Sequence, residues 1–401
     1  MKKFIKLILI ASIIAMNLNF IACDNGSILN EILGGVNSDY VVLDGEDVKK
    51  DEILAYESPY KDACTTYYKD TLSGEELELY KIFLYAYEHG NTSIGYYSSN
   101  KNLGDSYDKV LQCLSAENPF IDWNQKYSYT SLSDCYRFEN SQLDKKDIQL
   151  KIDAYNKAKS LVQSIPANSS SYDKLLWIYN YVTNNVKYVD DVNSYLDGSP
   201  SFIYDALIKG KTQCSGFADT VTMMCNLAGI QSITVCGETS EGHAWNLINL
   251  DGDFYYCDPT SDSAIKESMP EWGKSLNLSF LKSEEVFSSN GYKIDKETVI
   301  KFPKALNKKY DNNYVDFNLK NLSNNDELIA IAKKMMKENK YVVIHLQETS
   351  VLDEDKCKEA IQYILDYICN NMTSSEYNYV SINNFINEGS NDLVLFASYE
   401  K

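Results

Sequence analysis

Three residues of the kinds used in nucleophilic catalysis occur in order within a stretch of 45 residues. Cys214 supplies a thiol, His243 an imidazole and Asp258 a carboxylate. A thiolate can attack a carbonyl carbon, an imidazole can move the proton, and a carboxylate can fix the orientation of the imidazole. The order and the closeness of these residues predict an enzyme with a cysteine nucleophile.

The residues after Cys214 predict that this cysteine begins a helix. Phe217, Val221 and Met224 recur at helical spacing, and Gly229 is a typical C-terminal stop. The N–H groups of a first helical turn have no partner within the helix and lie at the positive end of its macrodipole. This position favours a thiolate over a thiol and can also hold a developing oxyanion.

A hairpin after this helix predicts how the other two residues meet. The pair Asp251-Gly252 is typical of a two-residue turn, and counting outward from it places Trp245 opposite Asp258. His243, two residues from Trp245, then lies on the same face of the sheet as Asp258 and is its diagonal neighbour. Such neighbours have Cβ atoms within about 7–8 Å, close enough for a hydrogen bond between the side chains. A slip of one residue would separate the two residues onto opposite faces.

The motifs around these residues resemble those of the transglutaminase-like superfamily. They are Gly-Lys-x-x-Cys-x-Gly-Phe-Ala (210–218), Gly-His-Ala-Trp-Asn (242–246) and Asp-Gly-x-Phe-Tyr-x-x-Asp-x-Thr (251–260). The resemblance covers residues 168–265 and implies a papain-like α+β core, in which the nucleophile helix packs on an antiparallel sheet. It also implies Cys214 as the nucleophile, His243 as the base and Asp258 as the orienting acid.

The chain departs from the family pattern just after the third motif. Relatives often have tryptophan where this chain has Ser261, so an aromatic side chain beside the site is missing. This departure concerns the substrate groove and not the three candidate catalytic residues. Trp245 could line that groove, or it could be a core aromatic on the sheet. Tyr204 is the candidate for a side-chain oxyanion donor.

The first residues predict export. Residues 1–22 have a lysine-containing start and a short apolar core, as signal peptides do. The segment Phe20-Ile21-Ala22-Cys23 resembles the lipobox of bacterial lipoproteins, in which the cysteine is lipidated. We therefore expect a lipid anchor at Cys23 and a location on the extracellular face of a bacterial membrane. Simple secretion is the alternative.

The overall composition excludes some partners. The 401 residues carry a net charge of −19, which argues against binding to nucleic acid. Ten cysteines occur without a CxxC pair and with only three histidines, so we expect no metal site and no organic cofactor. Export makes disulfides possible, and the sequence leaves open whether any form among Cys64, Cys113, Cys135, Cys357 and Cys369.

The chain predicts several regions beyond the signal peptide. They are a tether over 23–50, a mostly helical region over 51–167, the catalytic domain over 168–300, and a small α+β domain over 301–401. Within the second region, a helix should end at Gly90, and residues 91–143 look irregular or strand-like. The last domain should contain strands at 314–319, 341–346, 377–382 and 393–399, with helices at 326–339 and 353–370.

Together these features predict an exported cysteine-dependent amide hydrolase, a peptidase or isopeptidase acting on protein or cell-wall peptide through a thioester. The same residues would serve a protein-glutamine γ-glutamyltransferase that forms crosslinks. A non-catalytic surface-binding lipoprotein on the same fold is a further alternative.

Overall fold

The computed structural model describes residues 38–311, except 101, 122–125, 133, 190–201 and 269–275, and shorter segments beyond them. Those segments are residues 314–318, 330, 341–347, 359, 362–367, 379–387 and 392–400. The predicted signal peptide and the lipidation site Cys23 lie outside the described residues. No helix within these ranges is long and apolar enough to cross a membrane.

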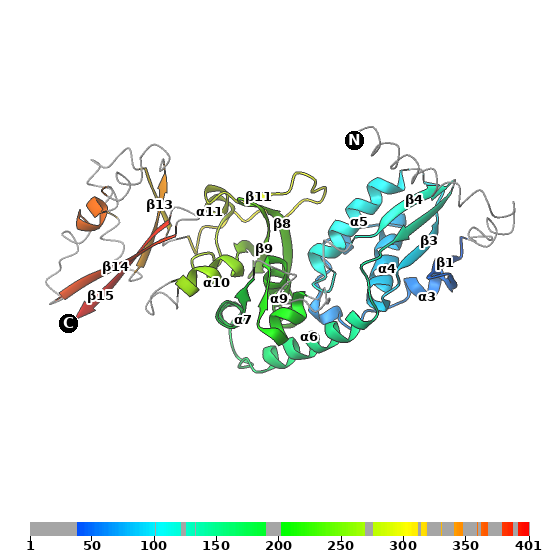
Figure 1. Cartoon of the computed structure of the whole chain (residues 1–401), viewed down its shortest axis with the longest axis horizontal. Coiled ribbons are helices and arrows are strands. Elements are labelled where there is room, and N and C mark those ends of the chain that lie inside the picture. Colours follow the sequence, from blue (N-terminus) through cyan, green and yellow to red (C-terminus); the bar gives the residue numbers. More distant parts are fainter. Residues whose placement is uncertain are drawn as a thin grey trace, which may run out of the picture. The chain divides into compact units, whose positions relative to one another are not determined.

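The chain divides into two compact units, and Figure 1 colours their elements along the sequence. Unit 1 comprises the chain up to Ser58 with Leu72–Leu111 and Asn124–Ile148, and unit 2 comprises Pro59–Thr71, Gln112–Trp123 and Gln149–Lys401. Two helices have residues in both units, α5 (Leu103–Glu117) and α6 (Lys146–Gln163).

Unit 1 is built on a five-stranded antiparallel sheet with the strand order β2-β1-β3-β5-β4. Its elements are β1 (Tyr40–Leu43), β2 (Glu46–Lys49), α3 (Lys50–Leu54), α4 (Gly74–His89), β3 (Ser93–Tyr97), β4 (Ser128–Leu132) and β5 (Cys135–Glu139). Phe83 on α4 is fully buried, and its ring meets Phe138 of β5 at 5.0 Å between centroids. The helix ends where expected, at Gly90 with φ of 64°.

The structure differs from two expectations for this part of the chain. The tether predicted over 23–50 overlaps β1 and β2, and Val41 in β1 is fully buried. Strand β1 pairs with β3, a long-range contact that the local pattern does not indicate. Helix α5 lies in the stretch expected to be irregular or strand-like. Its buried residues follow a helical period that the Ser-rich and Tyr-rich composition concealed: Leu103, Tyr107, Val110, Leu111 and Leu114.

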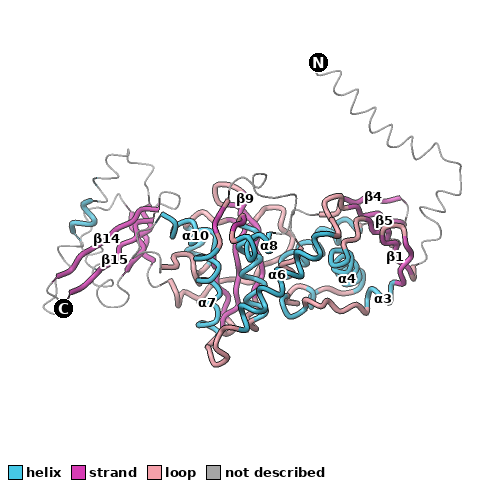
Figure 2. Tube along the Cα trace, turned by 60° about the horizontal axis from the view of Figure 1, so that its bottom comes forward, coloured by secondary structure: helices cyan, strands magenta, loops and turns pink. Residues whose placement is uncertain are grey.

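The domain of unit 2 that carries Cys214 centres on a four-stranded antiparallel sheet with the order β10-β9-β8-β11. Its strands are β8 (Ser232–Glu238), β9 (Gly242–Leu250), β10 (Asp253–Cys257) and β11 (Lys293–Ile294). Helix α9 (Cys214–Leu227) packs against β8 and β9, and α7 (Ser171–Asn185) and α10 (Pro259–Ser268) pack on α9. Figure 2 distinguishes these helices from the strands by colour. This is the predicted α+β arrangement of a nucleophile helix on an antiparallel sheet.

Shorter elements complete unit 2 before the C-terminal sheet. They are the 3₁₀ turns Lys61–Ala63 and Lys69–Thr71, β6 (Lys187–Tyr188), α8 (Phe202–Tyr204), a π-helical turn (Asp205–Lys209), β7 (Lys211–Thr212) and α11 (Glu284–Ser289). Strands β6 and β7 pair in parallel and form a separate two-stranded sheet.

Helix α9 forms because its apolar residues recur on the face that meets the core. Phe217, Val221 and Met224 are fully buried in one hydrophobic cluster with residues of α7 and the sheet. Gly229 follows with φ of 78°, a left-handed conformation that suits glycine after a helix. The predicted helix and its end are confirmed.

The hairpin of β9 and β10 has the predicted register. Leu250 pairs with Asp253 across the turn, and the ladder continues to Asn246 opposite Cys257. Asp251 and Gly252 both have positive φ, 56° and 99°, as a tight two-residue hairpin turn requires. The next position outward therefore places Asp258 opposite Trp245, as the count from the turn predicted.

The last part of the chain contains a second four-stranded sheet. Its strands are β12 (Tyr314–Asn318), β13 (Tyr341–Gln347), β14 (Tyr379–Asn387) and β15 (Asp392–Glu400), in the order β12-β13-β15-β14. Three of them were predicted to within one residue at each end, whereas β14 continues five residues beyond the predicted end at 382. Strands β12 and β13 pair in parallel, which requires a crossover between them. The helix predicted over 353–370 is described at 362–367, and the one over 326–339 lies almost wholly outside the described residues.

Candidate active site

The thiol of Cys214 lies at the first residue of α9 and is partly exposed. Gln213 precedes it with extended backbone and gives the helix no side-chain cap. The positive end of the helix macrodipole therefore lies beside the sulfur atom. A negative charge on sulfur, or on the oxygen of a carbonyl under attack, would be stabilised at this end of α9.

Gly216 allows two other segments to approach the start of α9. A Cβ atom at this position would lie 2.8 Å from the carbonyl oxygen of Phe202 and would also overlap the hydroxyl of Thr212. The Thr212 hydroxyl donates a hydrogen bond to that same carbonyl at 3.2 Å. Any larger residue would displace the turn that holds Cys214.

His243 lies on β9 opposite Gly237 of β8, and its side chain is 15% exposed. Its Nε2 is 2.8 Å from Oδ2 of Asp258, which leaves Nδ1 as the ring nitrogen available to Cys214. Burial alone would lower the pKa of His243. The negative charge of Asp258, and hydrogen bonds with Asp258 and Cys214, instead raise that pKa to about 10.

Asp258 is fully buried just after β10, and each of its carboxylate oxygens has two hydrogen-bond donors. Oδ1 accepts the backbone N–H groups of Thr260 at 2.9 Å and Ser261 at 3.0 Å. Oδ2 is bonded by His243 and by the hydroxyl of Tyr292 at 2.6 Å. Burial raises the pKa of Asp258, but the charge of His243 and these hydrogen bonds outweigh it and hold that pKa below its usual value.

The structure thus brings the predicted residues together in a line from thiol to imidazole to carboxylate. The helix start supplies Cys214, and the hairpin register places His243 and Asp258 on one face. The hydrogen bond between Cys214 and His243 is among the causes of the raised histidine pKa. This arrangement can move a proton between sulfur and nitrogen while the carboxylate holds the ring.

Tyr292 is a site residue that the sequence did not indicate. It lies between α11 and β11, well beyond the motif that ends at residue 260, and its ring is also near Trp245 and His243. No local spacing relates Tyr292 to Asp258, because the contact depends on how residues 276–294 fold back onto the sheet.

The two other predicted side chains are Trp245 and Tyr204. Trp245 is 1% exposed and packs against Tyr256 and Tyr292, so of the two alternatives it is the core aromatic. Tyr204 packs against the hydrophobic core, with the ammonium group of Lys209 at 5.7 Å from its ring centroid. Tyr204 is the last residue of α8, and α8 contacts α9, the helix that begins at Cys214. The role of Tyr204 as an oxyanion donor stays a prediction.

The cysteines other than Cys214 differ in environment. Cys225 and Cys257 are fully buried, and burial raises the pKa of both thiols. Within the described ranges none of the cysteines is in a disulfide; they are Cys64, Cys113, Cys135, Cys214, Cys225, Cys236 and Cys257. Cys357 and Cys369 lie outside those ranges.

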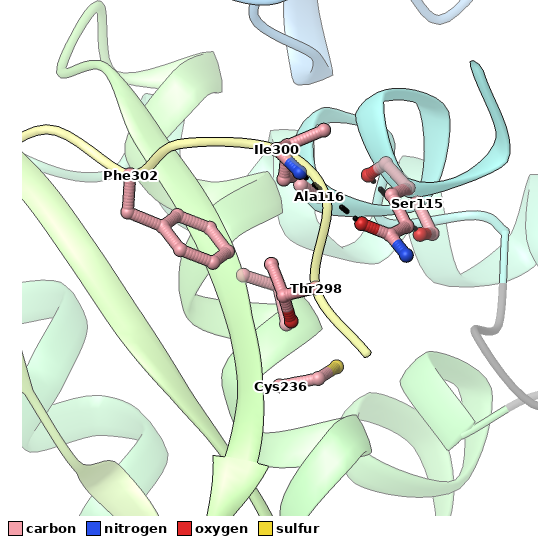
Figure 3. Close-up of a pocket in the computed structure, with 8 residues that line it drawn as sticks. Ser115, Ala116, Cys236, Thr298, Ile300 and Phe302 are labelled. Carbon is pink, nitrogen blue, oxygen red and sulfur yellow. Dashed lines mark hydrogen bonds between the residues drawn. The ribbon is translucent and has the colours of Figure 1, made fainter. Parts of the chain in front are cut away.

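A small pocket of unit 2 lies beside β8, and Figure 3 shows its lining. The lining consists of Gln112, Ser115, Ala116, Thr234, Cys236, Thr298, Ile300 and Phe302. Gln112 fixes the segment that contains Thr298 and Ile300, because its Oε1 accepts a hydrogen bond from the N–H of Val299 at 2.7 Å. Cys236 directly precedes Gly237, the strand partner of His243. None of the lining residues carries a formal charge.

Comparison with known families identifies the same part of the chain. The model of the transglutaminase-like superfamily matches residues 159–259, a segment that contains Cys214, His243 and Asp258. The chain is similar to kyphoscoliosis peptidase of Mus musculus, with 26% identity over 112 residues, which are 25% of this chain and 17% of that protein. The peptidase of Homo sapiens is 33% identical over 78 residues, 16% and 12% of the two chains. The chain therefore spans less than a fifth of these relatives.

Two solved structures are also similar to the chain. One is described as a TGase, with 19% identity and a TM-score of 0.24, covering 35% of this chain and 48% of that one. The other is the periplasmic domain of TgpA from Pseudomonas aeruginosa, with 16% identity and a TM-score of 0.24, covering 35% and 59%.

Proposed function

Residues 159–259 belong to the transglutaminase-like superfamily, and we propose that Cys214, His243 and Asp258 within them are the catalytic triad of an amide hydrolase. The observation that carries the proposal is the position of His243, which is hydrogen-bonded to Asp258 on one side and to Cys214 on the other. An imidazole held in this way can exchange a proton with the thiol.

The proposed reaction proceeds through a thioester. The thiolate of Cys214 attacks the carbonyl carbon of a peptide or isopeptide bond, and the negative charge moves to the carbonyl oxygen. As the C–N bond breaks, the imidazolium of His243 gives its proton to the leaving amine. Water then attacks the thioester, His243 takes a proton from that water, and the carboxylic acid leaves while the thiol is restored.

The start of α9 supplies the electrostatic part of this mechanism. The oxyanion forms next to Cys214, where the first-turn N–H groups and the helix macrodipole favour negative charge. Asp258 contributes by fixing the ring of His243 and by balancing the positive charge that the ring carries. Each side chain of the triad thus has a separate task.

The substrate and location that we propose rest on the sequence. The leader over 1–22 and the lipobox-like Cys23 support an exported enzyme anchored to the outer face of a bacterial membrane. A protein or a cell-wall peptide would be the amide substrate within reach there. An amine in place of water would resolve the same thioester and form a crosslink, so the two reactions differ in the acceptor alone.

Trapping of the acyl-enzyme tests the proposal. The full chain is mixed with p-nitrophenyl acetate, quenched in acid, and examined by peptide mass spectrometry. We expect one acetyl group on Cys214 in the wild type and in the control Cys64→Ala, which alters a partly buried thiol outside the triad, and none in Cys214→Ala. An unmodified Cys214 in the wild type would favour the non-catalytic alternative and contradict the proposal.

The fate of the acetyl group then distinguishes the two reactions. Added to the same mixture, a primary amine such as glycine methyl ester competes with water for the thioester. A hydrolase releases acetate at an unchanged rate and forms little amide. Amide as the main product would instead assign the crosslinking reaction to the triad.

A further inference from the structure

We propose that Tyr292 is a positioning residue of the triad, whose hydroxyl holds the Asp258 carboxylate in the orientation and the ionised state that His243 requires. The inference rests on the proposed function and extends it to a residue beyond the family match, which ends at residue 259. It is carried by the geometry around a single oxygen atom, Oδ2 of Asp258.

Two donors share this oxygen atom. The Tyr292 hydroxyl is 2.6 Å from it and Nε2 of His243 is 2.8 Å from it. The other carboxylate oxygen is held by the backbone of Thr260 and Ser261. The backbone donors fix one edge of the carboxylate, and Tyr292 fixes the edge that faces the imidazole. Without the hydroxyl, His243 would be the one donor left at Oδ2 among the residues that the structure describes.

The ring of Tyr292 is itself held in place. It lies edge-on to Trp245 at 5.3 Å between centroids and packs on Phe287 at 4.3 Å. Its backbone N–H bonds the carbonyl of Phe287 at 3.0 Å, just after Gly291 with φ of 86° has reversed the chain at the end of α11. The hydroxyl is therefore aimed by packing rather than by the hydrogen bond alone, so removing it leaves the ring where it is.

Tyr292 stays a donor throughout the working pH range. Burial, together with the charge of Asp258, raises its pKa well above the usual value for tyrosine. A tyrosine that keeps its proton can only stabilise a carboxylate that has lost its own. Tyr292 consequently favours the ionised form of Asp258, which is the form that supports a positively charged His243.

The other titratable groups near Asp258 come from each element packed around it. They are His243 of β9, Cys257 of β10, Tyr179 of α7, Asp262 of α10 and, across the imidazole, Cys214 of α9. Tyr179 donates to the backbone carbonyl of Asp258 at 2.8 Å and to the carboxylate of Asp262, and not to the Asp258 carboxylate. Tyr292 is thus the tyrosine that acts on the triad carboxylate itself.

The test compares Tyr292→Phe with Tyr155→Phe in the full chain. Each change removes a hydroxyl bonded to a carboxylate and keeps the ring, and Tyr155 bonds Asp62 at 2.8 Å away from the triad. The rate of Cys214 alkylation by iodoacetamide is measured from about pH 4 to pH 9, with folding checked by circular dichroism. The acid limb is the low-pH part of the plot of alkylation rate against pH, where the rate rises. A hydrogen bond to a charged group is strong enough to shift this limb by about one to two pH units.

We expect Tyr292→Phe to move the acid limb to higher pH by about one unit or more, and Tyr155→Phe to leave it in place. An acid limb of Tyr292→Phe that coincides with the wild type, or moves to lower pH, would overturn the inference. Failure of the proposed function looks different, because then Cys214 of the wild type would show no preferential alkylation at any pH.

Discussion

His243 and Asp258 are separated by 15 positions in the sequence, and their side chains meet at 2.8 Å between Nε2 and Oδ2. The turn at Asp251 and Gly252 produces this contact, because it sets the register of β9 against β10. A register shifted by one residue would direct one of the two side chains to the other face of the sheet. The two-residue turn therefore determines whether Asp258 can hold the imidazole of His243, the proposed partner of the Cys214 thiol.

Replacing Asp258 with asparagine should slow the chemistry and keep the shape of the site. The amide offers an N–H where the carboxylate offered a charge, so His243 is held in the wrong tautomer. We expect the rate of Cys214 acetylation by p-nitrophenyl acetate to fall by about a thousand-fold or more. The control is Asp62→Asn, which alters a carboxylate bonded by a tyrosine outside the triad. Equal rates in the two variants would contradict the assigned role.

The stability of the protein should depend on pH through His243. Its pKa in the folded state is raised to about 10 from an ordinary value of 6.5. The stabilisation is fully present below pH 6.5 and is lost as the pH rises towards 10. We expect the free energy of unfolding to fall by on the order of a few kcal/mol across this interval.

Urea unfolding at successive pH values measures this effect. The variant His243→Gln has no group that titrates at this position, so its free energy of unfolding should vary less over the same interval. If the free energies of unfolding of the wild type and His243→Gln vary equally with pH over this interval, Asp258 and Cys214 do not raise the pKa of His243.

Cys214→Ala should abolish activity and leave the fold intact. The sulfur atom is the proposed nucleophile and is partly exposed, so its removal opens no large cavity in the core. We expect turnover of any amide substrate to fall by at least about a thousand-fold, with a melting temperature close to that of the wild type. Residual turnover near the wild-type rate would show that another group carries the reaction.

Gly216→Ala should destabilise the protein, because the new Cβ would lie 2.8 Å from the carbonyl oxygen of Phe202. Overpacking of this kind costs about 1–3 kcal/mol. Gly242→Ala is the matched control, since its Cβ would meet nothing within 4 Å. Chemical unfolding of both variants measures the difference. Equal stability would mean that the start of α9 relaxes without cost.

The part of the site that the sequence predicted depends on local rules. Cys214 could be placed because apolar residues recur along α9 and Gly229 ends it. The contact of His243 with Asp258 could be counted from a turn whose residue types require positive φ. In both cases the signal lies within one helix or one hairpin, where periodicity and turn chemistry determine the structure.

The part that the sequence did not predict depends on contacts between distant segments. Tyr292 reaches Asp258 from 34 positions away, and no periodic pattern links them. The pairing of β1 with β3 in unit 1 is equally long-range. The family pattern has an aromatic residue where this chain has Ser261. That difference does not indicate that Tyr292 lies beside the Asp258 carboxylate.

Selective alkylation of Cys214 is the most direct test of the proposed triad. Iodoacetamide is applied to the full chain below about pH 8, where an ordinary thiol reacts slowly, and modified peptides are counted by mass spectrometry. Cys64 and Cys236 are internal references, because both are outside any disulfide and partly exposed like Cys214. We expect Cys214 to be modified first in the wild type and to lose this preference in His243→Gln. Modification of Cys214 no faster than Cys64 and Cys236 would contradict the proposed triad.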